Sequence, residues 1–326
     1  MIAFITGGTG FIGSFLAQRL TDACEQVYCL VRPTSSLKWL QQLPVNYVYG
    51  DLFNEAALAE ALHHATHVFH LAGVTKELTS AAYFHANGEG TAALLRACSR
   101  HARELERFVY VSSIAAAGPS RGKQLRTEGE TPQPVSVYGK SKYAGELACA
   151  EFRSQMPITI VRPPIVYGPR DRDVYNYFKQ VDLGIRLRPG RRERWTSLIH
   201  VHDLVRGILL AGTHLRAIGE TYFLTNPEPY EWNELGLAIA QALGKKSIAI
   251  TVPEAVTPVV AAVSELVAKI VRKPALLNFD KIREMRQAGW AFSGEKAKQQ
   301  LGFVTEIPLA EGLKQTVEWY RENGWL

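Results

Sequence analysis

Residues Ile5 to Leu20 read "ITGGTGFIGSFLAQRL", and this stretch decides the fold class. Three of its four glycines, Gly7, Gly10 and Gly13, are spaced three residues apart. They follow an apolar run and open an amphipathic helical pattern, where a backbone without Cβ and the N–H groups of a helix N-terminus can bind a phosphate. The order strand, glycine turn, helix is the fingerprint of a dinucleotide site rather than of a tight turn alone. We therefore predict that a cofactor pyrophosphate binds here.

Short apolar runs alternate with helical patterns through the first half of the chain. The expected strands are Ile2 to Thr6, Gln26 to Val31, Tyr47 to Tyr49, His67 to Leu71, Phe108 to Ser112 and Ile158 to Arg162. Helical patterns lie between them, for example at Gly10 to Thr21 and Asn54 to His64. Continuous apolar strands are typical of a sheet covered on both faces. The alternation predicts an α/β fold with a Rossmann-type doubly wound parallel sheet.

The pattern changes after Gly168, where strands become rare. Helical stretches remain at Trp232 to Leu243, Pro258 to Val271 and Leu309 to Asn323. We therefore expect a cofactor-binding domain of residues 1–168, with returning segments around 195–225, and a smaller, mostly helical substrate-binding lobe of residues 169–326. Thr257 to Val271 is apolar but shorter than the roughly 20 residues that span a bilayer. A packed helix is expected there, with a lipid-facing or substrate-facing cap as the alternative.

The composition excludes several classes of protein. Hydrophobic residues are 47% of the 326 and charged residues 21%, as in a globular protein rather than a disordered or fibrous one. The net charge of +6 is scattered, which argues against a nucleic-acid partner. Only Arg188 to Arg194 ("RPGRRER") is a basic cluster, expected to be a solvated loop or an anion contact. The four cysteines form no CxxC pair, which predicts that there is no metal site. Reduced cysteines and a start without a secretory signal predict a cytoplasmic location. No stable membrane insertion is expected.

The end of the second expected strand bears on the choice of cofactor. An acidic residue there accepts a hydrogen bond from the ribose 2′-hydroxyl of NAD, but this chain has Arg32, followed by Ser35 and Ser36. A guanidinium pairs with the 2′-phosphate that a carboxylate repels. We therefore predict NADP as the preferred cofactor. The alternative is NAD, with Arg32 as an ordinary surface residue.

Tyr138 and Lys142 lie four residues apart in "VYGKSKYAGE", on one face of a helix. A nearby ammonium favours the phenolate of a tyrosine, whose pKa is ordinarily about 10, so such a pair can exchange a proton with a carbonyl. Tyr175 and Lys179 have the same spacing, so position must decide between the two pairs. Only Tyr138 follows a strand whose carboxyl end presents hydroxyl residues, Ser112 and Ser113, at the sheet edge where such folds bind ligands. We expect Tyr175 to pack or to serve the substrate lobe.

These motifs make the chain similar to a known family. It resembles, over nearly its whole length, the extended short-chain dehydrogenases/reductases, also called the NAD-dependent epimerase/dehydratase family. The matching motifs are "TGGTGFIG" (6–13), "GDL" (50–52), "HLAG" (70–73), "NGEGT" (87–91), "YVSS" (110–113), "YGKSK" (138–142), "VRPPIVYGP" (161–169), "IHVHDL" (199–204), "LGF" (301–303) and "EGLKQTVEWY" (311–320).

The resemblance implies roles for the residues at matching positions. Ser113 is the expected catalytic hydroxyl, Tyr138 the acid/base, and Lys142 the residue that binds the nicotinamide ribose and lowers the tyrosine pKa. Asn87 is expected to brace the site. With the glycine turn and Arg32, the expected cofactor contacts are Phe11 and Ile12, Asp51 and Leu52 at the adenine, Leu71, Ala72 and Gly73 at the ribose and phosphates, Tyr138, Lys142, and Pro163, Ile165 and Val166 at the nicotinamide. A turn at Asp51 and an ordinary strand end at Gly73 are the alternatives.

Departures from the family pattern narrow the chemistry. Family dehydratases carry an Asp-Glu pair after the catalytic hydroxyl, whereas Ile114 and Ala115 stand here, so dehydration is not expected. Many nucleotide-sugar enzymes of the family place an arginine where this chain has Thr196, although Arg192 or Arg194 could replace it. A structural role is expected for His202. The chain looks closer to the dihydroflavonol-reductase-like and sterol-dehydrogenase-like branch.

Together these observations predict an enzyme with a small-molecule substrate. The expected activity is NAD(P)-dependent transfer of a hydride between nicotinamide and the carbonyl or secondary alcohol of a small, apolar compound. A nucleotide-sugar epimerase that retains NAD and a non-catalytic dinucleotide-sensing regulator are the alternatives. The resemblance further implies a homodimer joined through helices near Ala92 to His101 and Tyr138 to Phe152.

Overall fold

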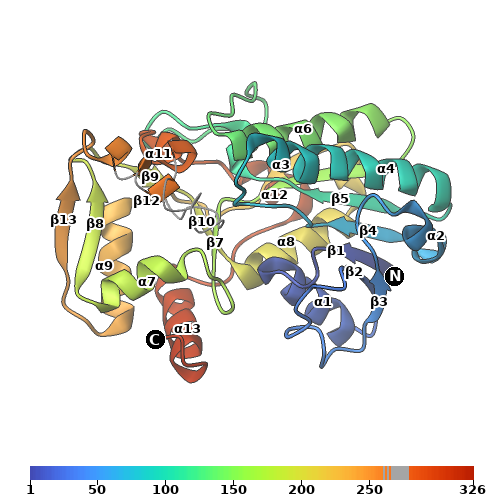
Figure 1. Cartoon of the computed structure of the whole chain (residues 1–326), viewed down its shortest axis with the longest axis horizontal. Coiled ribbons are helices and arrows are strands. Elements are labelled where there is room, and N and C mark those ends of the chain that lie inside the picture. Colours follow the sequence, from blue (N-terminus) through green and yellow to red (C-terminus); the bar gives the residue numbers. More distant parts are fainter. Residues whose placement is uncertain (260, 263, 266–278) are drawn as a thin grey trace.

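The computed structural model describes residues 1–259, 261–262, 264–265 and 279–326. Within these residues the central sheet has seven parallel strands in the order β11-β6-β5-β4-β1-β2-β3 (Figure 1). The strands are β1 (Ile2–Thr6), β2 (Gln26–Val31), β3 (Asn46–Tyr49), β4 (His67–His70), β5 (Arg107–Val111), β6 (Ile158–Arg162) and β11 (Thr221–Phe223). The order reverses beside β1, so the predicted doubly wound fold is confirmed.

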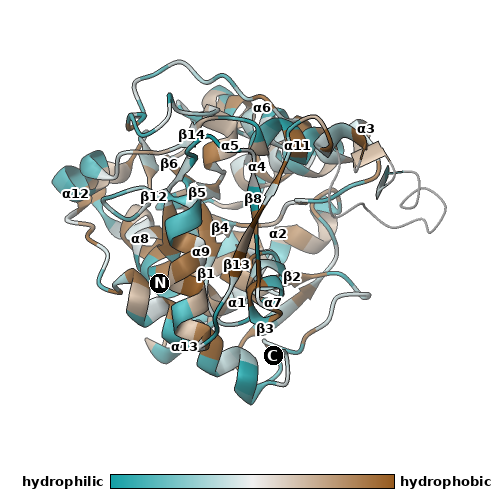
Figure 2. Ribbon diagram, turned by 90° about the vertical axis from the view of Figure 1, so that its left-hand side faces the viewer, coloured by the Kyte–Doolittle hydropathy of each residue, from teal (hydrophilic) through white to brown (hydrophobic). Residues whose placement is uncertain are grey.

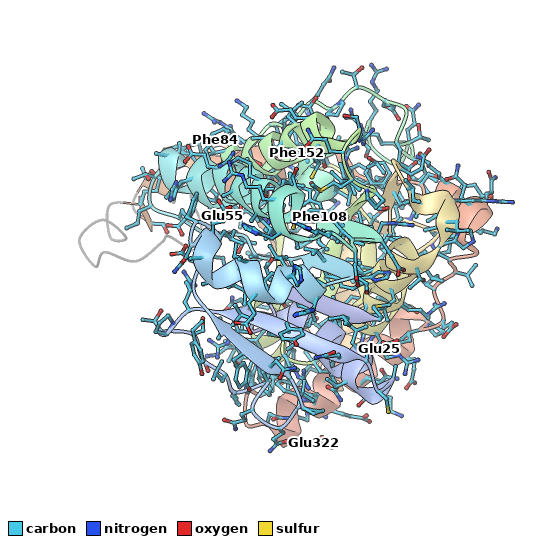
Figure 3. All side chains as sticks on the ribbon, turned by 90° about the vertical axis from the view of Figure 1, so that its right-hand side faces the viewer. Glu25, Glu55, Phe84, Phe108, Phe152 and Glu322 are labelled. Carbon is cyan, nitrogen blue, oxygen red and sulfur yellow. The ribbon has the colours of Figure 1, made fainter. Side chains whose placement is uncertain are left out.

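Every strand expected in the first half is present, with ends displaced by at most one residue. β4, β5 and β6 are buried along their whole length because helices cover both faces. The helices α1 (Phe11–Asp22) and α8 (Val201–Thr213) pack on one face, and α2 (Glu55–His64), α4 (Gly90–His101) and α6 (Val137–Phe152) pack on the other. Glu55, labelled in Figure 3, ties α2 to α4 by pairing with Arg100 (2.8 Å) and His101 (2.9 Å).

The seventh strand comes from far along the chain. β11 pairs with β6, so that Thr221 lies opposite Ile160 and Phe223 opposite Arg162. The carbonyl oxygen of Glu220 also accepts a hydrogen bond from the Ile160 nitrogen (2.9 Å). The sheet edge beyond β6 is therefore completed by a segment that follows Gly168 by more than fifty residues.

The C-terminal part is mostly helical, as predicted. One apolar core is shared by the helices α7 (Tyr175–Asp182), α9 (Trp232–Leu243) and α13 (Leu309–Glu322). Two further helices of the C-terminal part, α11 (Phe279–Met285) and α12 (Glu295–Leu301), lie outside this core (Figure 1). Within the described residues, three small sheets of short strands were not predicted: β7 (Ile165–Tyr167) with β10 (Leu198–His200), β9 (Trp195–Thr196) between β12 (Tyr230–Glu231) and β14 (Gly289–Trp290), and β8 (Ile185–Pro189) with β13 (Ile248–Val252). The helix expected at Pro258 to Val271 lies largely outside the described residues. Among the helices that are described, none is long and apolar enough to cross a bilayer.

Candidate active site

The glycine turn joins β1 to α1, and close packing requires its glycines. Gly7 has a φ of +75°, and a Cβ on Gly13 would lie 2.2 Å from the carbonyl oxygen of Gly7. Gly10 caps α1 without any side-chain hydrogen bond. The N–H groups of the first turn, which Phe11 and Ile12 begin, are therefore left for an anion. The turn fits a dinucleotide pyrophosphate.

Arg32 follows β2 directly and is exposed. Its backbone nitrogen donates to the Ser35 hydroxyl (3.2 Å), and the Ser35 nitrogen donates to the Arg32 carbonyl oxygen (2.9 Å). Within the described residues no carboxylate pairs with the Arg32 guanidinium. The side chain that stands where NAD enzymes place an acid is thus a cation available to a ligand.

Asp51 and Leu52 follow β3. One carboxylate oxygen of Asp51 accepts hydrogen bonds from the backbone nitrogens of Phe53 (2.9 Å) and Asn54 (3.1 Å). Leu52 packs against the core layer beneath α4. Asp51 therefore closes a turn, the role named above as the alternative to binding adenine.

The segment after β4 returns to β1 and then reaches the lysine of α6. The backbone nitrogens of Leu71 and Ala72 donate to the carbonyl (3.1 Å) and hydroxyl (3.2 Å) oxygens of Thr6. A Cβ on Gly73 would lie 3.6 Å from the Lys142 ammonium nitrogen. Two groups of expected site residues, from β4 and from α6, are thereby brought together.

Asn87 is buried and connects this segment to α6. Its side-chain oxygen accepts from the Val74 nitrogen (2.8 Å), and its amide nitrogen donates to the Val74 carbonyl (3.0 Å) and the Ser141 hydroxyl (2.9 Å). These three hydrogen bonds engage both the oxygen and the nitrogen of the side-chain amide. Asn87 therefore fixes the loop after β4 against the residue that precedes Lys142.

Ser113 and Tyr138 meet at the carboxyl end of β5. Ser113 caps the short helix α5 (Ile114–Ala117), where its hydroxyl accepts from the Ala115 nitrogen (3.1 Å). Burial raises the pKa of Tyr138 to about 12, and a hydrogen bond with Ser113 opposes this shift. The net direction is opposite to the lowering that the resemblance implied, since withdrawal from water dominates. Tyr138 therefore keeps its proton at neutral pH.

Lys142 is only 4% exposed. Its ammonium donates to the Val111 carbonyl oxygen (2.8 Å) and lies 4.4 Å from the centre of the Tyr110 ring. Burial lowers the pKa of Lys142 to about 8, and the charge of Glu146 acts in the opposite direction. The ammonium is therefore the form present at neutral pH, but it is lost more readily than that of an ordinary lysine.

Glu146 lies one turn beyond Lys142 and forms a buried ion pair with Arg162. The Arg162 guanidinium donates to both carboxylate oxygens (2.8 and 2.6 Å), and the Ser112 hydroxyl donates to one of them (2.6 Å). Both charged side chains are about 5% exposed. No role was predicted for Glu146 from the sequence. Its position four residues after Lys142, on the same face of the helix, could have indicated a buried charge.

Asp280 of α11 is a further residue that the sequence did not single out. Its carboxylate accepts hydrogen bonds from the backbone nitrogens of Val137 (2.7 and 2.9 Å) and Tyr138 (3.3 Å), and Ser136 accepts from Gly139 (2.9 Å). The donors of the first turn of α6 are thus satisfied by one local and one distant side chain. α11 is in this way attached to the helix that carries Tyr138.

Replacing Asp280 with alanine should lower the free energy of unfolding by about 1–2 kcal/mol, because the cap of α6 is lost. Denaturant titration followed by circular dichroism measures this. Asp280→Asn, which keeps an acceptor oxygen, should lose less than half as much. An Asp280→Ala variant as stable as the unaltered protein would show that the cap contributes nothing.

The nicotinamide end of the expected cofactor site lies where β6 passes into β7. The Pro163 carbonyl oxygen accepts from the Ile114 nitrogen (3.0 Å), which joins this segment to the residue after Ser113. Ile165 and Val166 belong to β7 and pair with β10. All expected contacts except Arg32, Asp51 and Leu52 therefore converge on the ends of β1, β4, β5 and β6.

The remaining sequence-based candidates lie in structural positions. Thr196 is buried, and Arg194 is held by Glu254 (2.8 Å). His202 packs edge-on against Phe15, with ring centres 4.9 Å apart. In the described part of the chain no cluster of His, Cys, Asp or Glu could hold a metal ion.

Tyr175, the rival of Tyr138, lies in an aromatic cluster. Its ring centre is 5.1 Å from those of Tyr320 and Trp325, and its hydroxyl donates to the Trp325 carbonyl oxygen. The hydroxyl is thus occupied in packing the C-terminal end of the chain.

Comparison with known proteins agrees with this geometry. The model of the NAD dependent epimerase/dehydratase family matches residues 3–224. Ceramide reductase of Caulobacter vibrioides is 29% identical, covering 100% of this chain and 96% of that protein, and 2-alkyl-3-oxoalkanoate reductase of Shewanella oneidensis is 26% identical, covering 96% and 84%. The crystal structure of gox2253 aligns with a TM-score of 0.82 at 27% identity, covering 100% of this chain and 99% of that one. The matched segment contains the sheet, the glycine turn and the residues at the end of β5.

Proposed function

The chain belongs to the NAD dependent epimerase/dehydratase family, and from this premise we propose that it is an oxidoreductase acting on the carbonyl or secondary alcohol of a small, apolar substrate. The observation that carries the proposal is the meeting of Ser113, Tyr138 and Lys142 at the carboxyl end of β5. Two relatives that align along nearly the whole chain are named as reductases, which supports an oxidoreductase that reduces a carbonyl group.

The chain's own residues orient the carbonyl and supply the proton. Ser113 and Tyr138 donate hydrogen bonds to the carbonyl oxygen, and Tyr138, protonated at neutral pH, passes its proton to that oxygen as the alcohol forms. The Lys142 ammonium stabilises the resulting phenolate. When bound, a nicotinamide cofactor would supply the hydride for the carbonyl carbon.

The geometry favours an apolar substrate over a nucleotide sugar. Thr196 stands where nucleotide-sugar enzymes place an arginine, and Arg194, the nearest buried replacement, is already paired with Glu254. Gripping a diphosphate with Arg194 would therefore require breaking an existing ion pair.

The test follows NADPH and NADH oxidation by the purified protein against long-chain ketones, aromatic ketones and keto-sugars. Turnover of an apolar ketone supports the proposal. A dinucleotide that co-purifies, with turnover only of nucleotide sugars and no net cofactor consumption, would replace it with the epimerase. Cofactor binding without any turnover would replace it with the regulator.

We further propose NADP as the preferred cofactor, because Arg32 is exposed and has no acidic partner in the described residues. Arg32→Asp should change the ratio of kcat/KM for NADPH and NADH by at least about tenfold in favour of NADH, since a charge-assisted contact to the 2′-phosphate is lost. The measurement is steady-state kinetics with both cofactors. Arg216→Asp, at an exposed arginine outside the cofactor residues, is the control, and an unchanged ratio in Arg32→Asp would retire the 2′-phosphate role.

The pKa of Lys142 predicts how carbonyl reduction depends on pH. Below about pH 8 Lys142 is charged, and above it the ammonium is lost, whereas Tyr138 keeps its proton to about pH 12. The rate of reduction should therefore fall as the pH rises through about 8. A pH–rate profile at saturating cofactor checks this, and a flat profile to pH 10 would contradict it.

Three wider expectations belong to the same proposal. Residues 1–168, with the returning segment around 195–225, would bind the cofactor, and residues 169–326 the substrate. A homodimer would form through α4 and α6. The location would be cytoplasmic.

A further inference from the structure

β8 and β13 form a two-stranded parallel ribbon at one end of the molecule (Figure 1). In their register Ile185 lies opposite Ile248, and Leu187 lies opposite Ile250. Because side chains alternate along a strand, these four point to one face of the ribbon, which we call the ribbon face. Arg186, between two of them, points the other way and is buried.

The inner side of β8 is covered. Arg186 donates to the Ser247 hydroxyl (2.8 Å) and to the Asn233 side-chain oxygen (2.7 Å). β8 also packs against α7 and α9. β8 is therefore anchored on one side, whereas β13 is exposed along most of its length, and among the described residues none covers the ribbon face.

The ribbon face is exposed to a degree unusual for branched aliphatic residues. Ile248 is 74% exposed, Ile250 46%, and Leu183, which precedes β8, 72%. Ile185 and Leu187 are each 37% exposed. Figure 2 faces this end of the molecule, where β8 and β13 show both hydrophobic and hydrophilic colours. Contiguous exposed apolar side chains of this kind mark an interaction surface.

The surroundings of the ribbon face are basic. Residues 182–194 and 244–259 contain seven basic and three acidic residues, and two of the seven, Arg186 and Arg194, are buried. Arg191, Arg192 and Lys246 are exposed, as is Lys245, which lies 3.6 Å from Asp182. The cluster Arg188 to Arg194, noted in the sequence, thus lies at the end of the strand that bears the ribbon face.

Exposed apolar side chains surrounded by basic residues indicate a partner that is both apolar and negatively charged. A second copy of the chain would bring the same positive charges against these, which opposes association. A surface of anionic phospholipid accepts apolar side chains at the boundary of headgroups and acyl chains and pairs its phosphates with lysine and arginine. We propose that the ribbon face docks the protein peripherally on an anionic bilayer.

Flotation with phospholipid vesicles tests the proposal on the intact protein. It should bind vesicles of phosphatidylglycerol and phosphatidylcholine in equal parts, bind pure phosphatidylcholine at least about tenfold more weakly, and be released by salt. Ile248→Glu combined with Ile250→Glu should lower partitioning by at least about tenfold, because two apolar side chains are replaced by anions. Lys245→Glu combined with Lys246→Glu should do the same through charge alone, at about fivefold for each basic residue removed.

Leu215→Glu is the matched control, since Leu215 is 81% exposed but lies outside the ribbon. It should float like the unaltered protein, and circular dichroism should show that all variants are folded. Absence of binding by the unaltered protein, or equal binding by all variants, would overturn the proposal. So would self-association, measured by light scattering, that Ile248→Glu abolishes, because the ribbon face would then belong to a second copy. Binding is read without turnover, so its failure is distinguishable from failure of the proposed function.

Discussion

Tyr138→Phe is expected to lower turnover by at least roughly a hundredfold, the lower range for loss of a general acid. The substitution removes one oxygen, and with it the proton that the reduced carbonyl oxygen must receive. The ring remains, so its edge-on packing with Tyr83, at 6.4 Å between ring centres, is kept. Cofactor affinity should change little, because the hydroxyl acts at the substrate. Steady-state kinetics and cofactor titration by fluorescence measure the two effects.

Tyr175→Phe is the matched control for this experiment. Tyr175 has the same spacing to a lysine, but its hydroxyl donates to the Trp325 carbonyl oxygen in an aromatic cluster. Turnover should therefore be retained, with a loss of stability of about 1 kcal/mol from the missing hydrogen bond. Near-normal turnover in Tyr138→Phe, or an equal loss in both variants, would refute the assignment of Tyr138 as the proton donor.

Glu146→Ala is expected to have the largest effect on stability. It leaves the Arg162 guanidinium buried without its carboxylate, and breaking a buried pair in this way costs about 3–5 kcal/mol of unfolding free energy. Denaturant titration measures the loss. Glu55→Ala, which breaks a partly exposed pair with Arg100, should cost no more than about 1 kcal/mol. Comparable losses in the two variants would contradict the assigned burial.

The same glutamate also has a kinetic effect. The charge of Glu146 raises the pKa of Lys142, against the larger lowering by burial. In a folded Glu146→Gln variant the pKa of Lys142 should therefore lie below about 8, and the fall in the rate of carbonyl reduction should begin at a lower pH. An unchanged pH–rate profile would show that the two side chains do not interact.

Local pattern was enough for the sheet and for the glycine turn. The strands of the first half are continuous apolar runs, so they can be predicted from the local sequence. The glycine turn can be predicted in the same way, because Gly7 and Gly13 stand where a Cβ would collide with the backbone. The assignment of Tyr138 over Tyr175 also needed only their order relative to the strands. These predictions depended only on the periodicity of apolar residues and on the order of motifs along the chain.

Other features depend on contacts between residues far apart in sequence. Asp280 reaches the helix of Tyr138 across 142 residues, and β13 joins β8 across about sixty, with no local pattern to announce either pairing. The direction of the Tyr138 pKa was also missed, because a charged neighbour is visible in a sequence whereas burial is not. Pairing across distance and withdrawal from water are properties of the folded chain.

The completion of the sheet by β11 limits how this protein can be divided. A fragment that stopped at Gly168 would leave β6, whose residues read ITIVR and are fully buried, as an uncovered border with free backbone donors and acceptors. Such a border is a template for pairing between molecules and leads to aggregation. On the ribosome, the same border stays open until some sixty further residues have been synthesised, so the nascent chain is most vulnerable in that interval.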